Sequence, residues 1–329
     1  MTRSSSILWI LAVLIPIIGI IHLFSGVSDI DWNTFVKSIV NFDQTETAEV
    51  IIREIRLPRV ITAIVAGASL SLAGLLMQTL FQNPLAGPYV LGINSGASLF
   101  VAITTLTGVT FFTTQYGLAI NALLGAFVFG VLILFFSRLA RNHITLLLTG
   151  VMIGSFTSAF IAILQQMSHM QDLKRFTLWG LGSLQKVQLN ETPLLIATVL
   201  LGTILSLLMT RSLNILVLGT EEAEQHGIRV RRLKYQMIGI TALLTGIVTA
   251  FCGPIAFVGL AVPNIVRILL KTQEHKKLII GSILGGALFL LVSDLFIIKI
   301  EKLVLIPINA ITSIVGAPIV VFILFRKLK

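Results

Sequence analysis

Long runs of apolar residues alternate with short polar segments along the whole chain. The runs lie near residues 7–24, 60–80, 95–112, 117–137, 144–164, 192–210, 236–252, 255–270, 278–298 and 308–325. A helix needs about 20 apolar residues to cross the hydrocarbon core of a bilayer. The pattern therefore predicts about ten transmembrane helices in a single transmembrane domain, 1–329, whose connections are too short to hold a soluble domain.

Composition agrees with this pattern and excludes several classes of protein. Hydrophobic residues make up 56% of the chain, charged residues 12%, and the mean hydropathy is +0.98, whereas about 25% of residues in soluble domains are charged. A soluble enzyme, a nucleic-acid-binding module and a disordered tail are therefore excluded, and an all-α integral membrane protein is predicted. The first run also resembles a signal peptide, but it is longer than a usual signal core, so an uncleaved span is favoured.

The basic residues predict how the spans are oriented. When the N-terminus is placed in the cytoplasm and the spans alternate, most of the 24 Lys and Arg residues fall on the cytoplasmic side. The acidic residues between Asp29 and Glu54 then fall on the opposite side. The net charge of +10 thus follows from the positive-inside rule and requires no nucleic acid as a partner. Both termini are expected in the cytoplasm.

Gly and Pro interrupt the apolar pattern at two corresponding places. The segment Gln82 to Pro88 follows the second run, and Gly253-Pro254 follows the seventh. Such residues free backbone groups at membrane depth, which is tolerated only inside protein or beside a water-filled path. Because an odd number of spans separates spans two to five from spans seven to ten, the two sets run in opposite directions. Paired interruptions in inverted halves are typical of transporters, although each one alone is also explained by tight helix packing.

Few polar side chains lie within the runs. They are His22, Gln78, Gln165, Gln166 and Asp294. Carriers driven by an ion gradient usually place Asp, Glu or His near mid-membrane. His22 and Asp294 lie near the ends of their runs, so we expect both at the membrane interface, and coupling to a proton or sodium gradient has little chemical support.

Residues for catalysis or cofactor binding are also scarce. The spans carry no paired carboxylates and no His spacing typical of a metal site. The single cysteine, Cys252, is better explained as a small buried hydrophobe than as a reactive thiol. The phosphate-binding pattern GxxxxGK[ST] does not occur. No catalytic residue, metal or cofactor is expected on this chain, and any ATPase must be a separate chain.

Two segments have the composition of protein contact sites. On the outer side, Arg56 and Arg59 flank Pro58, which suits the first turn of the second span. Their guanidinium groups suit carboxylates of a partner, although snorkelling at the interface explains them equally well. On the inner side, residues 211–235 form the longest cytoplasmic segment. Within it, Thr220 and the acids that follow favour the start of a helix and Gly227 its end, whereas a plain solvated connection explains only the charges.

These motifs together resemble the FecCD/BtuC-type permease family of ABC importers for iron-siderophores, haem and cobalamin. The matching stretches cover nearly the whole chain: Arg56-Leu57-Pro58-Arg59, Gly67-Ala68, Gly74 to Gln78, Asn83 to Ala86, Leu91-Gly92, Trp179 to Leu184, Gly219 to Gly227, Gly253 to Leu260, and Gly316-Ala317-Pro318. The resemblance implies a type II ABC importer permease of ten spans with two inverted halves. It also implies a multi-pass protein of the bacterial plasma (inner) membrane.

The resemblance further implies partners and roles for particular residues. The partners are a second permease copy or paralogue, two cytoplasmic ABC ATPases that bind ATP and Mg²⁺, and an extracytoplasmic substrate-binding protein. Arg56 and Arg59 would receive acidic residues of the binding protein. The coupling segment to the ATPase would be Glu221, Glu222, Ala223, Glu224, Gln225, His226 and Gly227. The inner gate and path would include Gln78, Asn83, Leu85, His143, Ile144, Trp179 and Ser183.

The chain departs from the family pattern at its C-terminal half. Relatives usually carry Arg four residues after the aspartate that matches Asp294, where this chain has Ile298 followed by Lys299. Lys299 is a weaker substitute because an ammonium is a point charge without the planar fork of Arg. Leu305-Ile306-Pro307 replaces a common Glu-Leu-Pro, and Asn264 stands where His is frequent.

The sequence thus predicts the permease of an ATP-driven importer, with a ferric siderophore as its cargo. Haem or cobalamin is the alternative within the family. A gradient-driven secondary transporter is a more distant alternative, because inverted halves serve both classes. A membrane-embedded enzyme is the least favoured.

Overall fold

The computed structural model describes residues 3–26, 31–40, 42–109, 117–140, 143–301 and 306–327, and all regular structure in these ranges is helical. Seven helical segments are long and apolar enough to span a membrane, and three shorter apolar helices, Ile93–Thr107, Val258–Leu270 and Ile308–Ile323, complete the set. The ten helices fall on the ten apolar runs. The predicted all-α membrane fold is confirmed.

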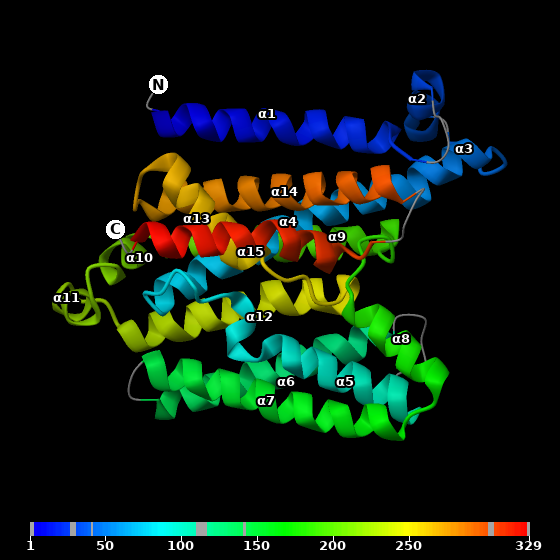
Figure 1. Ribbon diagram of the computed structural model, residues 1–329. Coiled ribbons are helices and arrows are strands. Elements are labelled where there is room, and N and C mark those ends of the chain that lie inside the picture. Colours follow the sequence, from blue (N-terminus) through cyan, green and yellow to red (C-terminus); the bar gives the residue numbers. More distant parts are fainter. Residues whose placement is uncertain are drawn as a thin grey trace.

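These ten apolar helices lie side by side in one bundle (Figure 1). They are α1 (Arg3–Phe24), α4 (Leu57–Leu80), α5 (Ile93–Thr107), α6 (Gly117–Leu139), α7 (His143–Met167), α9 (Thr192–Leu208), α12 (Val230–Cys252), α13 (Val258–Leu270), α14 (His275–Ile300) and α15 (Ile308–Lys327). The connections hold α2 (Trp32–Val40), α3 (Thr47–Val50), a π-helical turn η1 (Ile51–Arg56), η2 (Pro88–Leu91), α8 (Met170–Gly180), η3 (Leu189–Glu191), α10 (Thr210–Leu216) and α11 (Thr220–Gln225).

Helix α4 forms the centre of the bundle. Its membrane window is 89% buried, whereas that of α1 is 17% buried. Small residues allow neighbouring backbones to approach it closely: a Cβ at Gly67 would overlap the carbonyl oxygen of Gly286 in α14, and a Cβ at Gly74 that of Gly259 in α13. Such close approach is how helices gain packing energy in a membrane, where burial from water contributes little.

The two halves of the chain make equivalent contacts, as the inverted pattern predicts. Helices α4 to α7 form one half, apart from η2, and α12 to α15 form the other. Helices α4, α5, α6 and α7 correspond in order to α12, α13, α14 and α15. With this correspondence, four contacts made by helices of the first half have equivalents in the second: α4–α14 and α12–α6, α5–α6 and α13–α14, α5–α7 and α13–α15, and α4–α13 and α12–α5. The helices α4 and α12 themselves pack together. This exchange of partners is expected of two halves related by a pseudo-twofold axis in the membrane plane.

The two ends of the bundle carry different connections. The N-terminal end of α1 and the C-terminal end of α15 lie on the same side as α10 and α11, while α2, α3 and α8 lie on the opposite side (Figure 1). This arrangement agrees with an even number of spans. Below, the α11 side is called the inner end and the α8 side the outer end.

Helix boundaries differ from the apolar runs where polar residues continue a helix. Helix α12 begins at Val230 rather than near 236, because Arg231, Arg232 and Lys234 form its first turns beyond the apolar stretch. Helix α4 begins at Leu57 with Pro58 in its first turn, as predicted, and continues the helical path of α3 and η1. Helix α5 ends at Thr107, where Gly108 adopts a left-handed conformation with φ of 71°.

Candidate functional site

A buried ionic cluster joins three helices near the outer end. The guanidinium of Arg59 in α4 donates from Nε to Oδ2 of Asp294 at 2.7 Å and from Nη2 to Oδ1 at 3.0 Å. Nε2 of His22 in α1 lies 2.7 Å from the same Oδ2. Asp294 is 2% exposed, so this carboxylate is almost fully removed from solvent. Such bidentate geometry is among the strongest hydrogen-bonded arrangements of charged groups.

Sequence reasoning placed His22 and Asp294 separately at the ends of their spans and did not predict this cluster. The available signal was that His22, Arg59 and Asp294 all lie toward the same membrane face. Their joint burial places the three side chains inside the bundle, where Nε2 of His22 and the guanidinium of Arg59 are satisfied by the carboxylate of Asp294.

The cluster continues into a cavity of about 320 Å³ at the outer end, whose largely apolar lining also carries charged and amide groups. Nη1 of Arg59 lies 3.4 Å from Oε2 of Glu301, and Nε2 of Gln185 donates to Oε1 of Glu301 at 3.0 Å. Ser183 and Lys186 also line this cavity, and partial burial lowers the pKa of the Lys186 ammonium. The cavity thus brings basic and acidic side chains together at the outer end of the bundle.

The three residues expected to contact a binding protein differ in their exposure. Arg56 and Arg59 are each 7% exposed. Nη1 of Arg56 donates to the carbonyl oxygen of Leu23 at 2.8 Å, so its side chain binds the end of α1. Lys299 is exposed on α14. Within this chain the two arginines therefore have intramolecular partners, and Lys299 is the exposed cation of the three.

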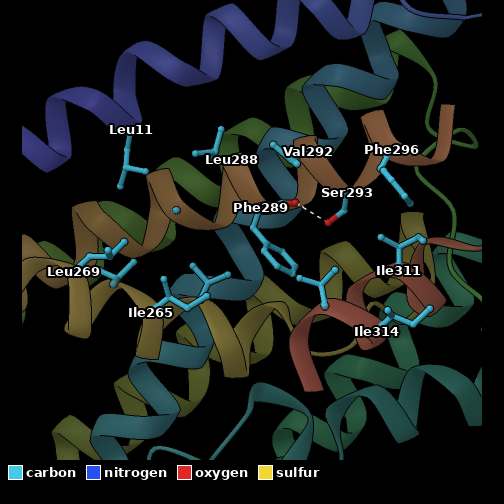
Figure 2. A pocket seen from close by; sticks show the side chains of 14 residues that line it. Leu11, Ile265, Leu269, Leu288, Phe289, Val292, Ser293, Phe296, Ile311 and Ile314 are labelled. Carbon is cyan, nitrogen blue, oxygen red and sulfur yellow. Dashed lines mark hydrogen bonds between the residues drawn. The ribbon is translucent and has the colours of Figure 1, made fainter. Parts of the chain in front are cut away.

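A second cavity, of about 520 Å³, has a different chemistry (Figure 2). It lies among α1, α13, α14 and α15, and its lining includes Leu11, Leu269, Phe289 and Ile314. Ser293, the polar side chain labelled in Figure 2, donates its hydroxyl to the carbonyl oxygen of Phe289 at 2.7 Å. This cavity therefore offers apolar surface rather than recognition of polar groups.

The predicted path residues on α4 and after it lie near the inner end. Gln78 is 3% exposed; its Nε2 donates to the carbonyl oxygen of Leu260 at 3.1 Å, and its Oε1 accepts from Nη1 of Arg267. Asn83 Oδ1 accepts the backbone N–H of Leu85 at 2.9 Å, which stabilises a turn. Both Asn83 and Leu85 are half-buried.

The other predicted path residues are spread over the bundle. Ile144, in the first turn of α7, is 69% exposed, and His143 begins α7, although its side chain lies outside the described residues. Trp179 is 4% exposed and stacks on Phe176 with ring centroids 6.3 Å apart. The backbone N–H of Ser183 donates to the carbonyl oxygen of Cys252 at 2.7 Å. Trp179 lies in α8, at the outer end (Figure 1), whereas Asn83 and Leu85 follow Gln82, whose side chain contacts α10 at the inner end.

The predicted coupling segment forms a short helix that stands out from the inner end. Its residues other than Ala223 are exposed, and Ala223 is fully buried. Gly227, with φ of 77°, ends the helix as predicted: its N–H bonds the carbonyl of Glu224 at 2.9 Å, and the N–H of Ile228 bonds that of Ala223 at 3.0 Å. This pair of bonds is a Schellman motif. Thr220 is the first helical residue, as predicted, and Gly219 is the N-cap.

Comparisons with known proteins agree with this architecture over nearly the whole chain. Residues 13–326 match the FecCD transport family. The haemin transport system permease protein HmuU of Yersinia pestis is 35% identical, over 83% of this chain and 82% of its own length. A probable iron chelatin transport system permease protein of Helicobacter pylori is 31% identical, over 93% of this chain and 94% of its own length.

A third relative and a solved structure extend the comparison. The vitamin B12 import system permease protein BtuC of Photorhabdus laumondii is 34% identical, over 86% of this chain and 84% of its own length. A structure described as an inward-facing conformation of a putative metal-chelate type ABC transporter is 27% identical and superposes with a TM-score of 0.85. The superposition covers 98% of this chain and 99% of that one.

Proposed function

Because the chain belongs to the FecCD transport family and is a permease of an ABC importer, we propose that it imports a ferric siderophore. Like its relatives it is a transport subunit rather than an enzyme, and ATP hydrolysis takes place on a separate subunit. The chain itself supplies the path through the membrane. The alternatives of a secondary transporter and of a membrane-embedded enzyme do not fit this family.

The observation that carries the choice of cargo is the likeness to iron-chelate permeases over the full length. The Helicobacter pylori relative, named for iron chelatin, matches 93% of this chain, a larger share than the haemin and vitamin B12 permeases match. All three cargoes are large metal chelates. The cavity at the outer end, lined among others by Arg59, Gln185, Lys186 and Glu301, suits a cargo or binding protein with charged and hydrogen-bonding groups.

We also propose the assembly in which the chain works. It pairs with a second permease copy or a paralogue, two cytoplasmic ATPases hold ATP and Mg²⁺, and an extracytoplasmic binding protein delivers the cargo. The inner end faces the cytoplasm, in line with the positive-inside rule, in a bacterial plasma (inner) membrane. Closure of the ATPase dimer on ATP would push on the segment from Glu221 to Gly227, whose exposed acids and fixed Gly227 turn suit a socket on a partner.

We keep the docking role for Arg56 and Arg59, but the geometry requires that Arg59 first give up an intramolecular partner. Carboxylates of the binding protein would meet Lys299 directly, whereas Arg59 would have to exchange Glu301, its more exposed partner, for an acid of the binding protein. Asp294 would stay in place because it is buried against both Arg59 and His22. Asn83, Leu85, His143 and Ile144 are proposed at the inner gate, and Gln78, Trp179 and Ser183 along the path.

A competition between cargoes tests the proposal. The complete importer would be reconstituted in liposomes with ATP inside, and uptake of a radiolabelled ferric siderophore, haemin and cyanocobalamin would be measured with the cognate binding protein outside. We expect ATP-dependent uptake of the ferric siderophore that excess unlabelled complex suppresses. Iron-free siderophore serves as the matched control. Uptake of haemin or cyanocobalamin without uptake of any ferric siderophore would transfer the assignment to that cargo.

A further inference from the structure

Hydrogen bonds between side chains join α10 to two spanning helices at the inner end. Oδ1 of Asn214 in α10 accepts the backbone N–H of His275 at 2.8 Å and lies 2.9 Å from Nδ1 of the same residue. His275 is the first residue of α14. A side chain from α10 therefore caps the N-terminus of α14, where the first N–H groups have no partner within the helix.

The ring of His275 carries this connection on to α4. The carbonyl oxygen of an amide accepts and cannot donate, so Nδ1 of His275 bears the proton shared with Asn214. Nε2 of His275 lies 3.0 Å from the hydroxyl oxygen of Thr79 in α4. His275 is 1% exposed and Thr79 is 4% exposed. One buried imidazole thus links α10, α14 and α4, and buried hydrogen bonds of this kind resist sliding because an unmatched partner is costly.

A second contact joins α10 to the segment that follows α4. Nε2 of Gln82 donates to the carbonyl oxygen of Leu216, the last residue of α10, at 3.1 Å. Gln82 has φ of 46°, a left-handed conformation that costs free energy for a residue with a Cβ. Its bond to α10 helps to hold this conformation, and with it the direction in which the chain leaves α4.

The segment 82–85 is also held from its other side. Nδ2 of Asn264 in α13 donates to the carbonyl oxygen of Pro84 at 2.8 Å. The segment thus lies between α10, through Gln82, and α13, through Asn264. We expect a displacement of α10 relative to α13 either to change the conformation of residues 82–85 or to break one of these two hydrogen bonds.

Helices α10 and α11 are connected by a short, hydrogen-bonded turn. The N–H groups of Leu218, Gly219 and Ala223 bond the carbonyls of Ile215, Leu216 and Gly219, at 3.0, 3.1 and 3.1 Å. This continuous set of backbone bonds leaves little slack between the two helices. A push on α11 is therefore expected to move α10 with it.

We propose that α10 transmits the displacement of α11 to segment 82–85, and that Asn214, His275 and Gln82 are the positioning residues of this transmission. The inference rests on the proposed function, in which α11 contacts the ATPase and Asn83 and Leu85 belong to the inner gate. It adds the physical connection between these two places.

The experiment measures the gate directly and does not depend on the cargo. Cys252, the single cysteine of the chain, is 1% exposed, so a cysteine introduced as Leu85→Cys is the accessible thiol. Its rate of labelling by a maleimide would be measured in the complete importer, without nucleotide and with ATP and vanadate. The variants are Asn214→Leu, matched with Asn214→Asp, which keeps an acceptor oxygen, together with Gln82→Glu and Gln82→Met, which both remove the Nε2 donor.

We expect nucleotide to change the labelling rate in the parent and in Asn214→Asp. The change should shrink about fivefold for each hydrogen bond lost in Asn214→Leu, Gln82→Met and Gln82→Glu. ATP hydrolysis and co-purification with the ATPase should remain, which separates loss of transmission from loss of folding. Because Gln82 is exposed, its variants test the idea even if Asn214→Leu fails to fold.

Two outcomes would overturn the inference, and they are distinguishable. A full nucleotide response in the Gln82 variants and in Asn214→Leu, if it folds, would show that α10 does not transmit the displacement, and the proposed function would stand. A labelling rate that nucleotide leaves unchanged in the parent would overturn the inference together with the proposed roles of α11 and Leu85.

Discussion

Replacement of Asp294 by leucine is expected to lower the free energy of unfolding by about 3–5 kcal/mol. The carboxylate of Asp294 receives two hydrogen bonds from Arg59 and one from His22, and all three residues are buried. The leucine variant leaves the guanidinium of Arg59 in an apolar bundle with only the more distant Glu301 as a charged partner. Unfolding in mixed detergent micelles, followed by circular dichroism, would measure the loss.

Two further variants separate the effect of the unpaired charge from the loss of packing. Glu301→Gln should change the free energy of unfolding by no more than about 1 kcal/mol, because this carboxylate is 26% exposed and 3.4 Å from Arg59. The double variant Arg59→Met, Asp294→Leu should recover most of the stability, since it leaves no unpaired buried charge. If Asp294→Leu alone were as stable as the parent, the buried cluster would not stabilise the outer end.

Gly74→Ala is expected to cost about 3 kcal/mol or more, a large effect for a single methyl group. A Cβ at position 74 would overlap the carbonyl oxygen of Gly259, a backbone atom that no rotamer change moves away. Helices α4 and α13 would have to separate, and α4 has the largest buried share of the seven long spans in the described part of the chain. The yield of folded protein and its melting temperature would measure the effect.

Gly239→Ala in α12 is the matched control. No heavy atom lies within 4 Å of a Cβ built at this position, so the methyl group meets open space. Alanine favours a helix over glycine by about 1 kcal/mol, and the variant should be as stable as the parent or slightly more stable. Equal stability of Gly74→Ala and Gly239→Ala would contradict the tight contact between α4 and α13.

The sequence predicts the helices well because the membrane leaves the backbone little choice. A peptide group that faces lipid has no water to bond, so a long apolar run satisfies its backbone by forming a helix. Local signals were also reliable where the physics is local, as at Gly227, whose left-handed conformation ends α11. The start of α11 was likewise predicted, since Thr220 is its first residue, directly after Gly219 at the N-cap position.

Contacts between distant segments could not be predicted in this way. Arg59 and Asp294 lie 235 positions apart, and no local pattern says which face of each helix meets the other. Arg56 and Arg59 were expected either to meet carboxylates of a partner or to snorkel at the interface, and the sequence did not show that each is 7% exposed and hydrogen-bonded within the chain. The connection from Asn214 to His275 was likewise invisible, because α10 was treated only as part of a long connecting segment.

The account depends most on one statement, that ATP hydrolysis on a separate subunit drives transport through this chain. The most direct test is accumulation of the cargo in liposomes that contain the complete importer, with the transmembrane ion gradients collapsed by ionophores. We predict accumulation with ATP, and none when the lysine of the ATPase phosphate-binding loop is replaced by alanine. Accumulation by this chain alone, driven by an ion gradient and without any ATPase, would contradict the account.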